Sequence, residues 1–318
     1  MMPLVGAGEG SPGIRRRSPR RRSVAALLAL PALPLVVALA GGACVARQPA
    51  WVAQLGYRPD EVFSARRGRL GMPFVDVTIG PTTQRWLFDT GDMVGLTLAT
   101  SSLDRSNLPV IGRWDRLDSD GRVIGSYRRV RAPRVRLLGR TLTDSTLFEF
   151  SEEALVGLVG PDALPGTRFT LDSRAGVLAV AGSPLGIAPP GFVALPLTRS
   201  SRHPRLILAM GRVNGRPVLV EFDTGASRTN VDPRLVRDLA LPAAANGVRV
   251  DSLAIGPLVF AVPSAKVVPK SGIDPTLDPP IQLAVGSDVL SGILLTVDYA
   301  GGRMLLRAAD VAVEHARR

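Results

Sequence analysis

A short apolar segment that ends in Phe-Asp-Thr-Gly occurs twice in this chain of 318 residues, and it constrains the fold more than any other feature. The first copy is Leu-Phe-Asp-Thr-Gly at residues 87–91, and the second is Leu-Val-Glu-Phe-Asp-Thr-Gly at residues 219–225. One Asp-Thr-Gly alone is weak evidence, because Asp before Gly is ordinary turn chemistry. The surroundings of the two copies therefore decide whether the repeat is structural.

Two further anchors follow each copy in the same order. They are LVGPDAL at 158–164 against AVGSDVL at 284–290, and FTLD at 169–172 against LTVD at 295–298. The glycine of the first anchor and the aspartate of the second are 12 residues apart in both halves. Ordered anchors with a shared spacing indicate an internal duplication. The sequence predicts two related halves that each supply one carboxylate, Asp89 and Asp223.

Two carboxylates that meet at an axis of internal symmetry form a useful acid and base. When they lie about 3 Å apart both cannot ionise cheaply, so they share one proton and their apparent pKa values split. The ionised member can take a proton from a bound water while the protonated member polarises a carbonyl, which hydrolyses an amide without a metal or a covalent intermediate. The candidate catalytic residues are Asp89 and Asp223, which we call the dyad.

Over residues 70–307 the chain resembles the retropepsin-like and pepsin-like aspartic protease superfamily, in the single-chain, two-lobed form found among bacteria. Both Asp-Thr-Gly turns match the family motif, and Val159-Gly160 and Val285-Gly286 match its hydrophobic-hydrophobic-Gly strand. The resemblance implies a mainly β fold of two homologous acid-protease β-barrel lobes related by a pseudo-two-fold axis.

The same resemblance assigns supporting roles to four residues beside the dyad. Thr90 and Thr224 are expected to hydrogen-bond across the axis and to fix the geometry of the dyad. Gly91 and Gly225 are expected to allow the tight turns and the close approach that a crowded axis requires.

The first half contains residues that the second half lacks. From Gly91 to Gly139 is 48 residues, whereas from Gly225 to Gly256 is 31. The additional residues include 114–130, where Ser-Asp-Gly-Arg at 119–122 is a hairpin turn signal. The resemblance implies a flap that closes over substrate; its candidate residues are Asp120, Gly121 and Tyr127, with Trp114 as a second aromatic. A surface hairpin without a gating role is the alternative.

The two motifs continue differently. Ala226-Ser227 follows the second motif, as is usual in the family, whereas Asp92-Met93 follows the first and adds a third carboxylate. An inward Asp92 would raise the cost of ionising the dyad and would put full activity in doubt, whereas an outward Asp92 would be solvated. Asp92 and Ser227 are therefore candidates for modulating the dyad.

Short apolar alternations, such as residues 74–79 and 248–253, predict a mainly β protein. Asp232 before Pro233 predicts the N-terminus of a helix that extends to residue 240. With 46% hydrophobic residues the chain can bury a substantial core. The predicted organisation is an export segment at 1–44, a tether at 45–69, an N-terminal lobe with the flap at 70–182, a linker at 183–197, a C-terminal lobe without a flap at 198–308, and a tail at 309–318.

The formal net charge of +12 does not indicate nucleic-acid binding. Beyond residue 44 it falls to +7, from 33 basic and 26 acidic residues, and Lys266 and Lys270 are the only lysines of the chain. Scattered arginines usually mark solvated faces, and no nucleic-acid motif accompanies them. His203 and His315 lack partners at metal-ligand spacing, so neither a metal nor a cofactor is expected. The expected partner is an extended peptide or protein substrate, bound by a monomer.

Residues 1–44 are typical of an export segment. Six arginines precede residues 24–44, which carry no charge. Cys44, the only cysteine, follows Gly-Gly-Ala, which resembles a lipobox with Gly in place of the usual Leu. A lipoprotein signal modified at Cys44, an ordinary cleaved signal and an uncleaved membrane anchor all remain open. Each places the lobes outside the cytoplasm, in the periplasm, on a membrane through the N-terminal segment or a lipid, or secreted.

Two function hypotheses follow. The first is an exported aspartic endopeptidase in which the dyad activates water. The second is a catalytically inactive bilobal protein of the cell envelope that binds peptides or serves as a scaffold. Both intact Asp-Thr-Gly turns and the single flap favour the first hypothesis, whereas Asp92 favours the second.

Overall fold

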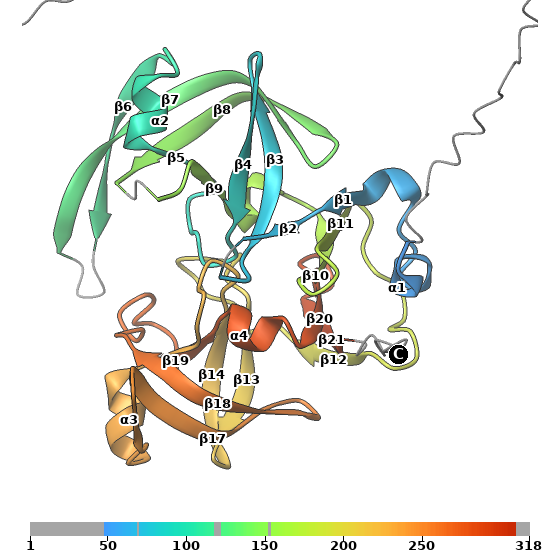
Figure 1. Cartoon of the computed structure of the whole chain (residues 1–318), viewed down its shortest axis with the longest axis vertical. Helices are drawn as coiled ribbons and strands as arrows, with labels where there is room; N and C mark the ends of the chain where they lie inside the picture. Colours follow the sequence, from blue (N-terminus) through green and yellow to red (C-terminus); the bar gives the residue numbers. More distant parts are fainter. Residues whose placement is uncertain (1–47, 69, 118–121, 152–153, 310–318) are drawn as a thin grey trace, which may run out of the picture. The chain divides into compact units, whose positions relative to one another are not determined.

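The computed structural model describes residues 48–309, apart from 69, 118–121 and 152–153 (Figure 1). The described residues form 21 strands, four short α-helices and two 3-10 helices, which confirms the prediction of a mainly β protein. The strands form three sheets. The predicted export segment with Cys44, the predicted turn residues Asp120 and Gly121, and the tail from residue 310 lie outside the described residues.

An eight-stranded sheet is built from residues 66–159 and lies at the top of Figure 1. Its strand order is β2-β3-β4-β9-β5-β8-β7-β6. The bounds are β2 (Arg66–Arg67), β3 (Pro73–Ile79), β4 (Thr82–Phe88), β5 (Leu96–Ala99), β6 (Val110–Leu117), β7 (Val123–Leu137), β8 (Arg140–Phe150) and β9 (Gly157–Val159). Pairs in it are mostly antiparallel, but β4 pairs with β9, and β5 with β8, in parallel.

A seven-stranded sheet is built from residues 208–285, with the order β13-β14-β19-β15-β18-β17-β16. The bounds are β13 (Leu208–Val213), β14 (Arg216–Phe222), β15 (Asn230–Val231), β16 (Ala243–Ala244), β17 (Gly247–Ile255), β18 (Leu258–Val267) and β19 (Ile281–Val285). Here β14 runs parallel to β19, and β15 runs parallel to β18. The parallel pairs therefore correspond in the two sheets. In the series β3–β9 and in the series β13–β19, the second strand pairs with the seventh and the third pairs with the sixth.

The third sheet has six strands and joins both halves of the chain, in the order β1-β11-β10-β20-β21-β12. The bounds are β1 (Val62–Ser64), β10 (Arg168–Asp172), β11 (Val177–Ala181), β12 (Val193–Pro196), β20 (Ile293–Asp298) and β21 (Arg303–Ala308). Its centre is the antiparallel pair β10–β20, in which Thr170 lies opposite Thr296. Their hydroxyl oxygens are 2.8 Å apart. The two repeated anchors FTLD and LTVD therefore pair with each other.

The helices are short: α1 (Ala50–Gln54), α2 (Thr100–Asp104), α3 (Pro233–Asp238) and α4 (Ser287–Leu290), with 3-10 turns η1 (Pro59–Glu61) and η2 (Pro161–Ala163). The predicted helix after the second motif is confirmed as α3. Its N-cap is Asp232, whose carboxylate accepts a hydrogen bond of 2.8 Å from the backbone N–H of Arg234, and it ends two residues earlier than predicted.

The prediction of a tether at 45–69 is wrong for its described part. Trp51 of α1 is 2% exposed, packs with Leu294 and Leu305 of the six-stranded sheet, and donates a hydrogen bond of 3.1 Å from Nε1 to Asp172 Oδ2. The physical reason is that this short segment contains several large apolar residues. Their burial is favourable because it removes apolar surface from water. The predicted linker likewise contributes a strand, because β12 pairs with β21.

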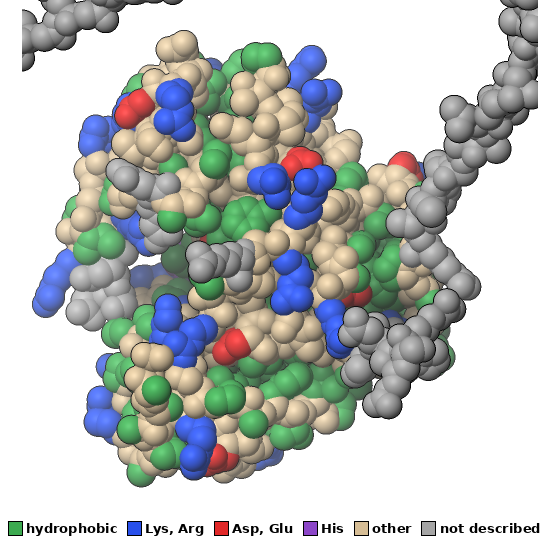
Figure 2. Space-filling model, viewed as in Figure 1, with side chains coloured by type: hydrophobic (Ala, Val, Ile, Leu, Met, Phe, Trp, Pro, Cys, Tyr) green, Lys and Arg blue, Asp and Glu red, His purple; other side chains and the backbone are tan. Residues whose placement is uncertain are grey.

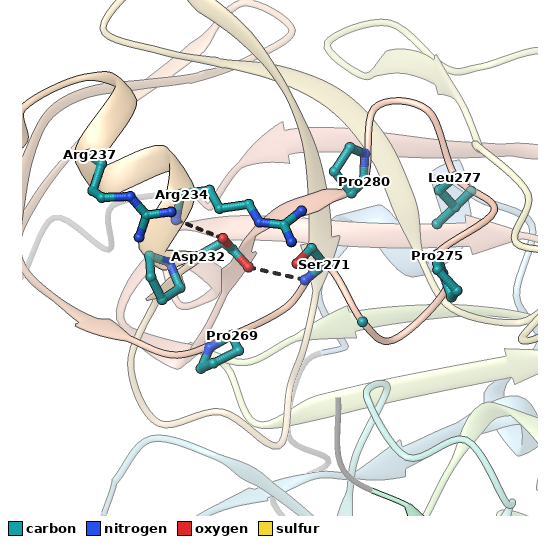
Figure 3. Close-up of a pocket in the computed structure, with 10 residues that line it drawn as sticks. Asp232, Arg234, Arg237, Pro269, Ser271, Pro275, Leu277 and Pro280 are labelled. Atoms are coloured by element: carbon teal, nitrogen blue, oxygen red, sulfur yellow. Dashed lines mark hydrogen bonds between the residues drawn. The ribbon is translucent and has the colours of Figure 1, made fainter. Parts of the chain in front are cut away.

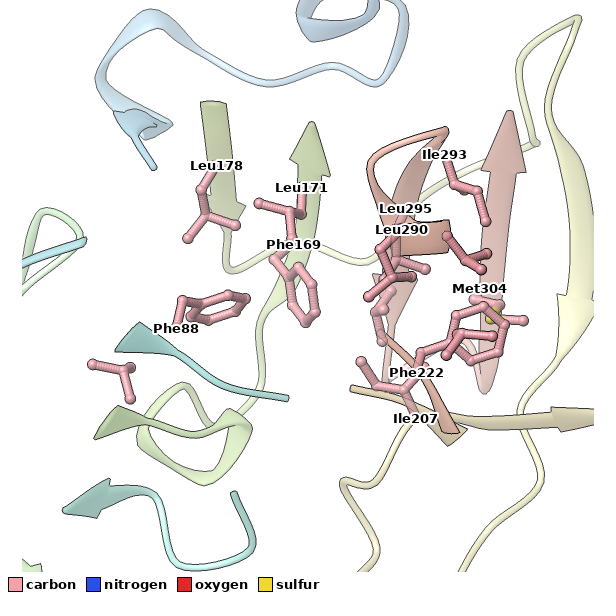
Figure 4. Packing of buried hydrophobic residues seen from close by; sticks show 14 of the residues in the cluster. Phe88, Phe169, Leu171, Leu178, Ile207, Phe222, Leu290, Ile293, Leu295 and Met304 are labelled. Carbon is pink, nitrogen blue, oxygen red and sulfur yellow. The ribbon is translucent and has the colours of Figure 1, made fainter. Parts of the chain in front are cut away.

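The main core includes the two phenylalanines that immediately precede the Asp-Thr-Gly turns, Phe88 and Phe222 (Figure 4). Phe88 and Phe222, the last residues of β4 and β14, are completely buried. Phe88 packs edge-on against Phe169 of β10, with ring centroids 5.3 Å apart. Burying each of these rings contributes roughly 1.5–3 kcal/mol. The core thereby fixes where β4 and β14 end, and so where the following aspartates lie.

Candidate active site

Equivalent strands place Asp89 and Asp223. Each follows the last residue of its strand, β4 or β14, and its backbone N–H donates to a carbonyl of the neighbouring parallel strand. Asp89 donates to Val159 of β9 over 2.9 Å, and Asp223 donates to Val285 of β19 over 3.0 Å. The hydrophobic-hydrophobic-Gly segments singled out in the sequence are thus the strands that hold the two turns.

Thr90 and Thr224 link the two turns by four hydrogen bonds. Each threonine backbone N–H donates to the hydroxyl of the other over 3.0 Å. The Thr90 hydroxyl donates to the carbonyl of Phe222 over 2.6 Å, and the Thr224 hydroxyl donates to the carbonyl of Phe88 over 2.5 Å. Both threonines are at most 1% exposed. Because buried polar groups are costly when unpaired, these bonds fix the turns relative to each other.

Gly91 and Gly225 allow the turns to approach closely. A Cβ atom on Gly91 would lie 2.8 Å from Asp223 Cγ, and one on Gly225 would lie 2.3 Å from Asp89 Cγ. Each glycine therefore lies against the carboxylate of the opposite turn. Neither is among the glycines with positive φ, so space rather than backbone conformation requires a glycine here. The structure brings the six residues 89–91 and 223–225 together.

The environment of Asp89 favours its protonated form. Burial raises the pKa of Asp89 well above its usual value, and the negative charges of Asp223 and Asp92 and a side-chain hydrogen bond with Asp223 raise it further. The backbone N–H of Gly91, which donates to Asp89 Oδ1 over 2.9 Å, acts in the opposite direction on this pKa. Asp223 Oδ1 accepts from the N–H groups of Gly225 and Ala226 at 2.9 and 3.0 Å. In such a pair, the protonated carboxyl can act as the acid, and the carboxylate that accepts hydrogen bonds can act as the base.

Asp92 faces the same cavity as the dyad. Its Oδ1 accepts a hydrogen bond of 3.2 Å from the backbone N–H of Val94, whereas Oδ2 is buried and has no hydrogen-bond partner among the described residues. Burial raises the pKa of Asp92 to about 6, with the negative charge of Asp162 adding to the effect. Ser227 is half-buried and is not among the cavity-lining residues in the described part of the chain.

Asp92 should make folding stability depend on pH. Its pKa is raised from 3.8 to about 6 on folding, so its contribution to stability is complete below about pH 4 and is lost as the pH rises through 6. The loss is on the order of 3 kcal/mol. We therefore expect Asp92→Asn to stabilise the protein at pH 7 but not at pH 4, as measured by urea unfolding. A variant equally shifted at both pH values would contradict this assignment.

A cavity of about 1030 Å³ opens onto the dyad. The eight-stranded sheet supplies an apolar wall that includes Leu87, Leu158 and Phe150, while Arg202, His203 and Ile273 line the cavity from the second half of the chain. Burial lowers the pKa of His203, so its imidazole is mainly neutral at pH 7. Leu87 and Leu158 belong to segments that the sequence analysis singled out, whereas Phe150, Arg202, His203 and Ile273 belong to no motif and were not identified as lining residues.

The predicted hairpin is formed by β6 and β7. Trp114 pairs with Tyr127 across the hairpin, with ring centroids 5.8 Å apart, and Trp114 also packs edge-on against Phe148 at 5.5 Å. Trp114, Asp115 and Arg116 of β6 line the cavity that contains the dyad. The hydroxyl of Tyr127 donates to Ser151 over 3.3 Å. This hairpin therefore forms part of the cavity wall, and the aromatic contacts steady it.

A buried ion pair beside Asp223 was missed in the sequence. Lys270 Nζ lies 3.0 Å from Oε2 of Glu221, and both side chains are nearly inaccessible to solvent. A charged residue inside the apolar end of β14, within the second motif itself, was the available signal. Its partner could not have been identified, since it lies 49 residues away in the sequence.

Within the ranges that the structure describes, no helix is long and apolar enough to span a membrane, and no three His, Cys, Asp or Glu side chains are arranged to bind a metal ion. On the face shown in Figure 2, arginine and lysine side chains lie in scattered groups rather than in one continuous patch. No protein-family model matches the sequence, and no curated protein matches it either.

Proposed function

We propose that the protein is an aspartic endopeptidase whose two homologous lobes are related by a pseudo-two-fold axis through the dyad. One observation carries the proposal: two Asp-Thr-Gly turns exchange reciprocal threonine hydrogen bonds and place each aspartate against the glycine of the other turn. The reciprocity of these bonds supports the axis, as does the shared order of parallel strands in the two sheets. The repeat of the sequence anchors supports common origin of the lobes.

The reaction proceeds by general acid and base catalysis. The ionised member of the dyad accepts a proton from a water molecule, and the water oxygen forms a bond to the carbonyl carbon of the peptide while the protonated member donates to the carbonyl oxygen. The tetrahedral intermediate then collapses: the dyad passes the proton taken from water to the amide nitrogen, the C–N bond breaks, and the proton on the former carbonyl oxygen returns to the dyad as the carboxyl product forms. Burial of Asp89 and its neighbouring negative charges support retention of the one proton that this mechanism needs.

The cavity favours an extended peptide as substrate. Its volume of about 1030 Å³ exceeds what a single amino acid requires, and its wall includes β6, an edge strand that can pair with a peptide backbone. In this proposal the β6–β7 hairpin is a flap, with Trp114 facing the substrate, and the protein acts as a monomer because both aspartates are in one chain. We also retain the proposal that residues 1–44 direct export, with Cys44 as a candidate for lipidation.

Arg202 is expected to favour substrates with acidic residues. It lines the cavity, and its side chain is exposed. An exposed charge pair contributes up to about 1 kcal/mol. Arg202→Ala should therefore lower kcat/KM about two- to fivefold for peptides with Asp or Glu, relative to matched peptides with Asn or Gln. Arg199→Ala, an exposed arginine that does not line the cavity, is the control; equal effects of both variants on both peptide sets would contradict the prediction.

The proposed function is tested by incubating the full-length protein with a peptide library over a range of pH and identifying the products by mass spectrometry. We expect cleavage at internal bonds, which the Asp223→Asn variant does not produce. If the protein binds library peptides but cleaves none of them at any pH, the result would instead support the second hypothesis, a catalytically inactive peptide-binding protein, which the presence of Asp92 favours. Cleavage that persists unchanged in the variant would assign the activity to other residues or to a contaminant.

A further inference from the structure

The ion pair of Glu221 and Lys270 occupies an unusual position. Glu221 lies on β14 two residues before Asp223, is 2% exposed, and accepts a hydrogen bond of 3.0 Å from Lys270 Nζ. Transferring two charged groups from water to such a site costs several kcal/mol for each, and a buried pair often contributes no net stability. Its location two residues before one member of the dyad therefore suggests a role other than stability.

The backbone around Lys270 is anchored independently of this pair (Figure 3). The carboxylate of Asp232 accepts hydrogen bonds from the N–H groups of Lys270 at 2.8 Å, Ser271 at 3.1 Å and Arg234 at 2.8 Å. Asp232 is itself the buried N-cap of α3. The neighbouring residues Pro269 and Gly272 line the cavity of the dyad. The lysine side chain thus starts from a fixed point in the cavity wall and extends inward to Glu221.

The ammonium group interacts with both members of the dyad. Burial acts to lower the pKa of Lys270, but the negative charges of Glu221, Asp223 and Asp89 outweigh it, so the pKa is raised. Burial also raises the pKa of Glu221, which the charge of Lys270 partly offsets. Because the interaction between two charges is mutual, an ammonium that is stabilised by the dyad must in turn stabilise the ionised state of the dyad.

We propose that Lys270 is a positioning residue whose buried ammonium, held in place by Glu221, sets the pH range in which the dyad carries a single negative charge. This inference rests on the proposed function for its catalytic meaning. The ammonium favours loss of the first proton from the dyad, whereas the carboxylate of Glu221 opposes it. Lys270 is therefore a buried counter-charge to the dyad, held by Glu221.

The other charged or titratable groups that line the cavity do not replace this counter-charge. They are Asp92, Asp115, Arg116, Arg202 and His203. Asp92 carries the wrong sign, and the neutral form of His203 is favoured by its lowered pKa. Arg116 and Arg202 are exposed, so water and salt screen their charges. Lys270, in contrast, is 8% exposed and acts through a poorly screened interior.

The electrostatic role predicts shifts of opposite sign for the two halves of the ion pair. Lys270→Met removes the positive charge, so the lower-pH limb of the activity profile should move to higher pH by about one unit. Glu221→Gln removes the negative charge but retains the ammonium, so the same limb should move to lower pH. Lys270→Arg should remain close to wild type. Simple loss of packing would not produce opposite shifts.

The experiment measures the pH dependence of peptide cleavage by these full-length variants, and in parallel titrates their ¹³C-labelled aspartate carboxyl carbons by NMR. Lys266→Met is the control, because Lys266 is the other lysine of the chain and is exposed on β18. Opposite shifts for the Lys270 and Glu221 variants, with none for Lys266→Met, support the inference. Shifts of the same sign, or no shift, overturn it.

The two readouts separate this inference from the proposed function. The NMR titration reports ionisation of the dyad even if the wild-type protein cleaves no peptide, so failure of the protease proposal leaves the electrostatic test intact. If Lys270→Met does not fold, Glu221→Gln carries the test alone: a shift of the dyad to lower pH supports the inference, and its absence contradicts it.

Discussion

Replacement of either Asp89 or Asp223 by Asn is expected to lower kcat for peptide cleavage by a factor of about 10³ or more. In the proposed mechanism each variant removes one of the two proton-transfer groups, and acid or base catalysis by a positioned side chain typically contributes about 10²–10⁴ in rate. The double variant should be only slightly less active than either single variant, because residues that act as one unit are strongly non-additive. Initial rates with one cleaved peptide, measured for all three variants, test both statements.

Loss of activity in these variants should not reflect loss of fold. Asn retains the acceptor oxygen to which the backbone N–H of Gly91 or Gly225 donates, so the turns keep their hydrogen bonds. Asp89→Asn also removes a carboxyl that burial disfavours as an anion, and the melting temperature at pH 7 should be unchanged or higher. Asp76→Asn, an exposed position on β3, makes the same chemical change elsewhere in the eight-stranded sheet. Equal losses of activity at positions 76 and 89 would refute the assignment of the dyad.

Gly225→Ala is expected to produce the largest loss of stability among conservative substitutions near the site, about 3 kcal/mol. Its new Cβ would lie 2.3 Å from Cγ and Oδ2 of Asp89. Asp89 cannot retreat easily, because the reciprocal threonine hydrogen bonds hold its turn in place. The two turns must therefore separate. A displacement of about 1 Å can lower a reaction rate about 10²-fold. We therefore expect the activity of Gly225→Ala to fall by a factor of at least about 10².

A graded series of glycine variants makes this prediction quantitative. Gly91→Ala should be less harmful than Gly225→Ala, because its Cβ would lie 2.8 Å from the Asp223 carboxylate. Gly186→Ala is the control, since no atom lies within 4 Å of its Cβ position and its φ is not positive. The urea midpoint should be highest for Gly186→Ala, lower for Gly91→Ala and lowest for Gly225→Ala. Identical midpoints for the first and last would show that the turns do not meet as closely as described.

The sequence was informative where local chemistry repeats. The paired Asp-Thr-Gly motifs located the ends of β4 and β14, and Asp232 before Pro233 located the start of α3. Strand segments with alternating burial, such as Pro73–Ile79, were also recognisable, because side chains alternate between the two faces of a strand. These features depend on a few neighbouring residues, which is why the sequence alone revealed them.

Contacts between distant segments were not predictable in the same way. Trp51 packs against strands more than 240 residues later in the chain, so the packing of its segment, which was predicted as a tether, could not be recognised from the local sequence. The anchors FTLD and LTVD were found, but nothing in either shows that β10 and β20 pair with each other. Lys270 similarly reaches Glu221 only because Asp232 fixes the backbone of its loop. Each of these contacts is a product of tertiary packing rather than of local pattern.

The proposed sharing of one proton by Asp89 and Asp223 is tested most directly by titrating the two wild-type carboxyl carbons by NMR, assigned through the Asn variants, between about pH 2 and pH 9. We expect the pair to titrate in two well-separated steps, with both carbons responding to each step, so that a single proton is retained over the interval between them. Two independent carboxyls, each ionising once near pH 4, would contradict a proton-sharing dyad.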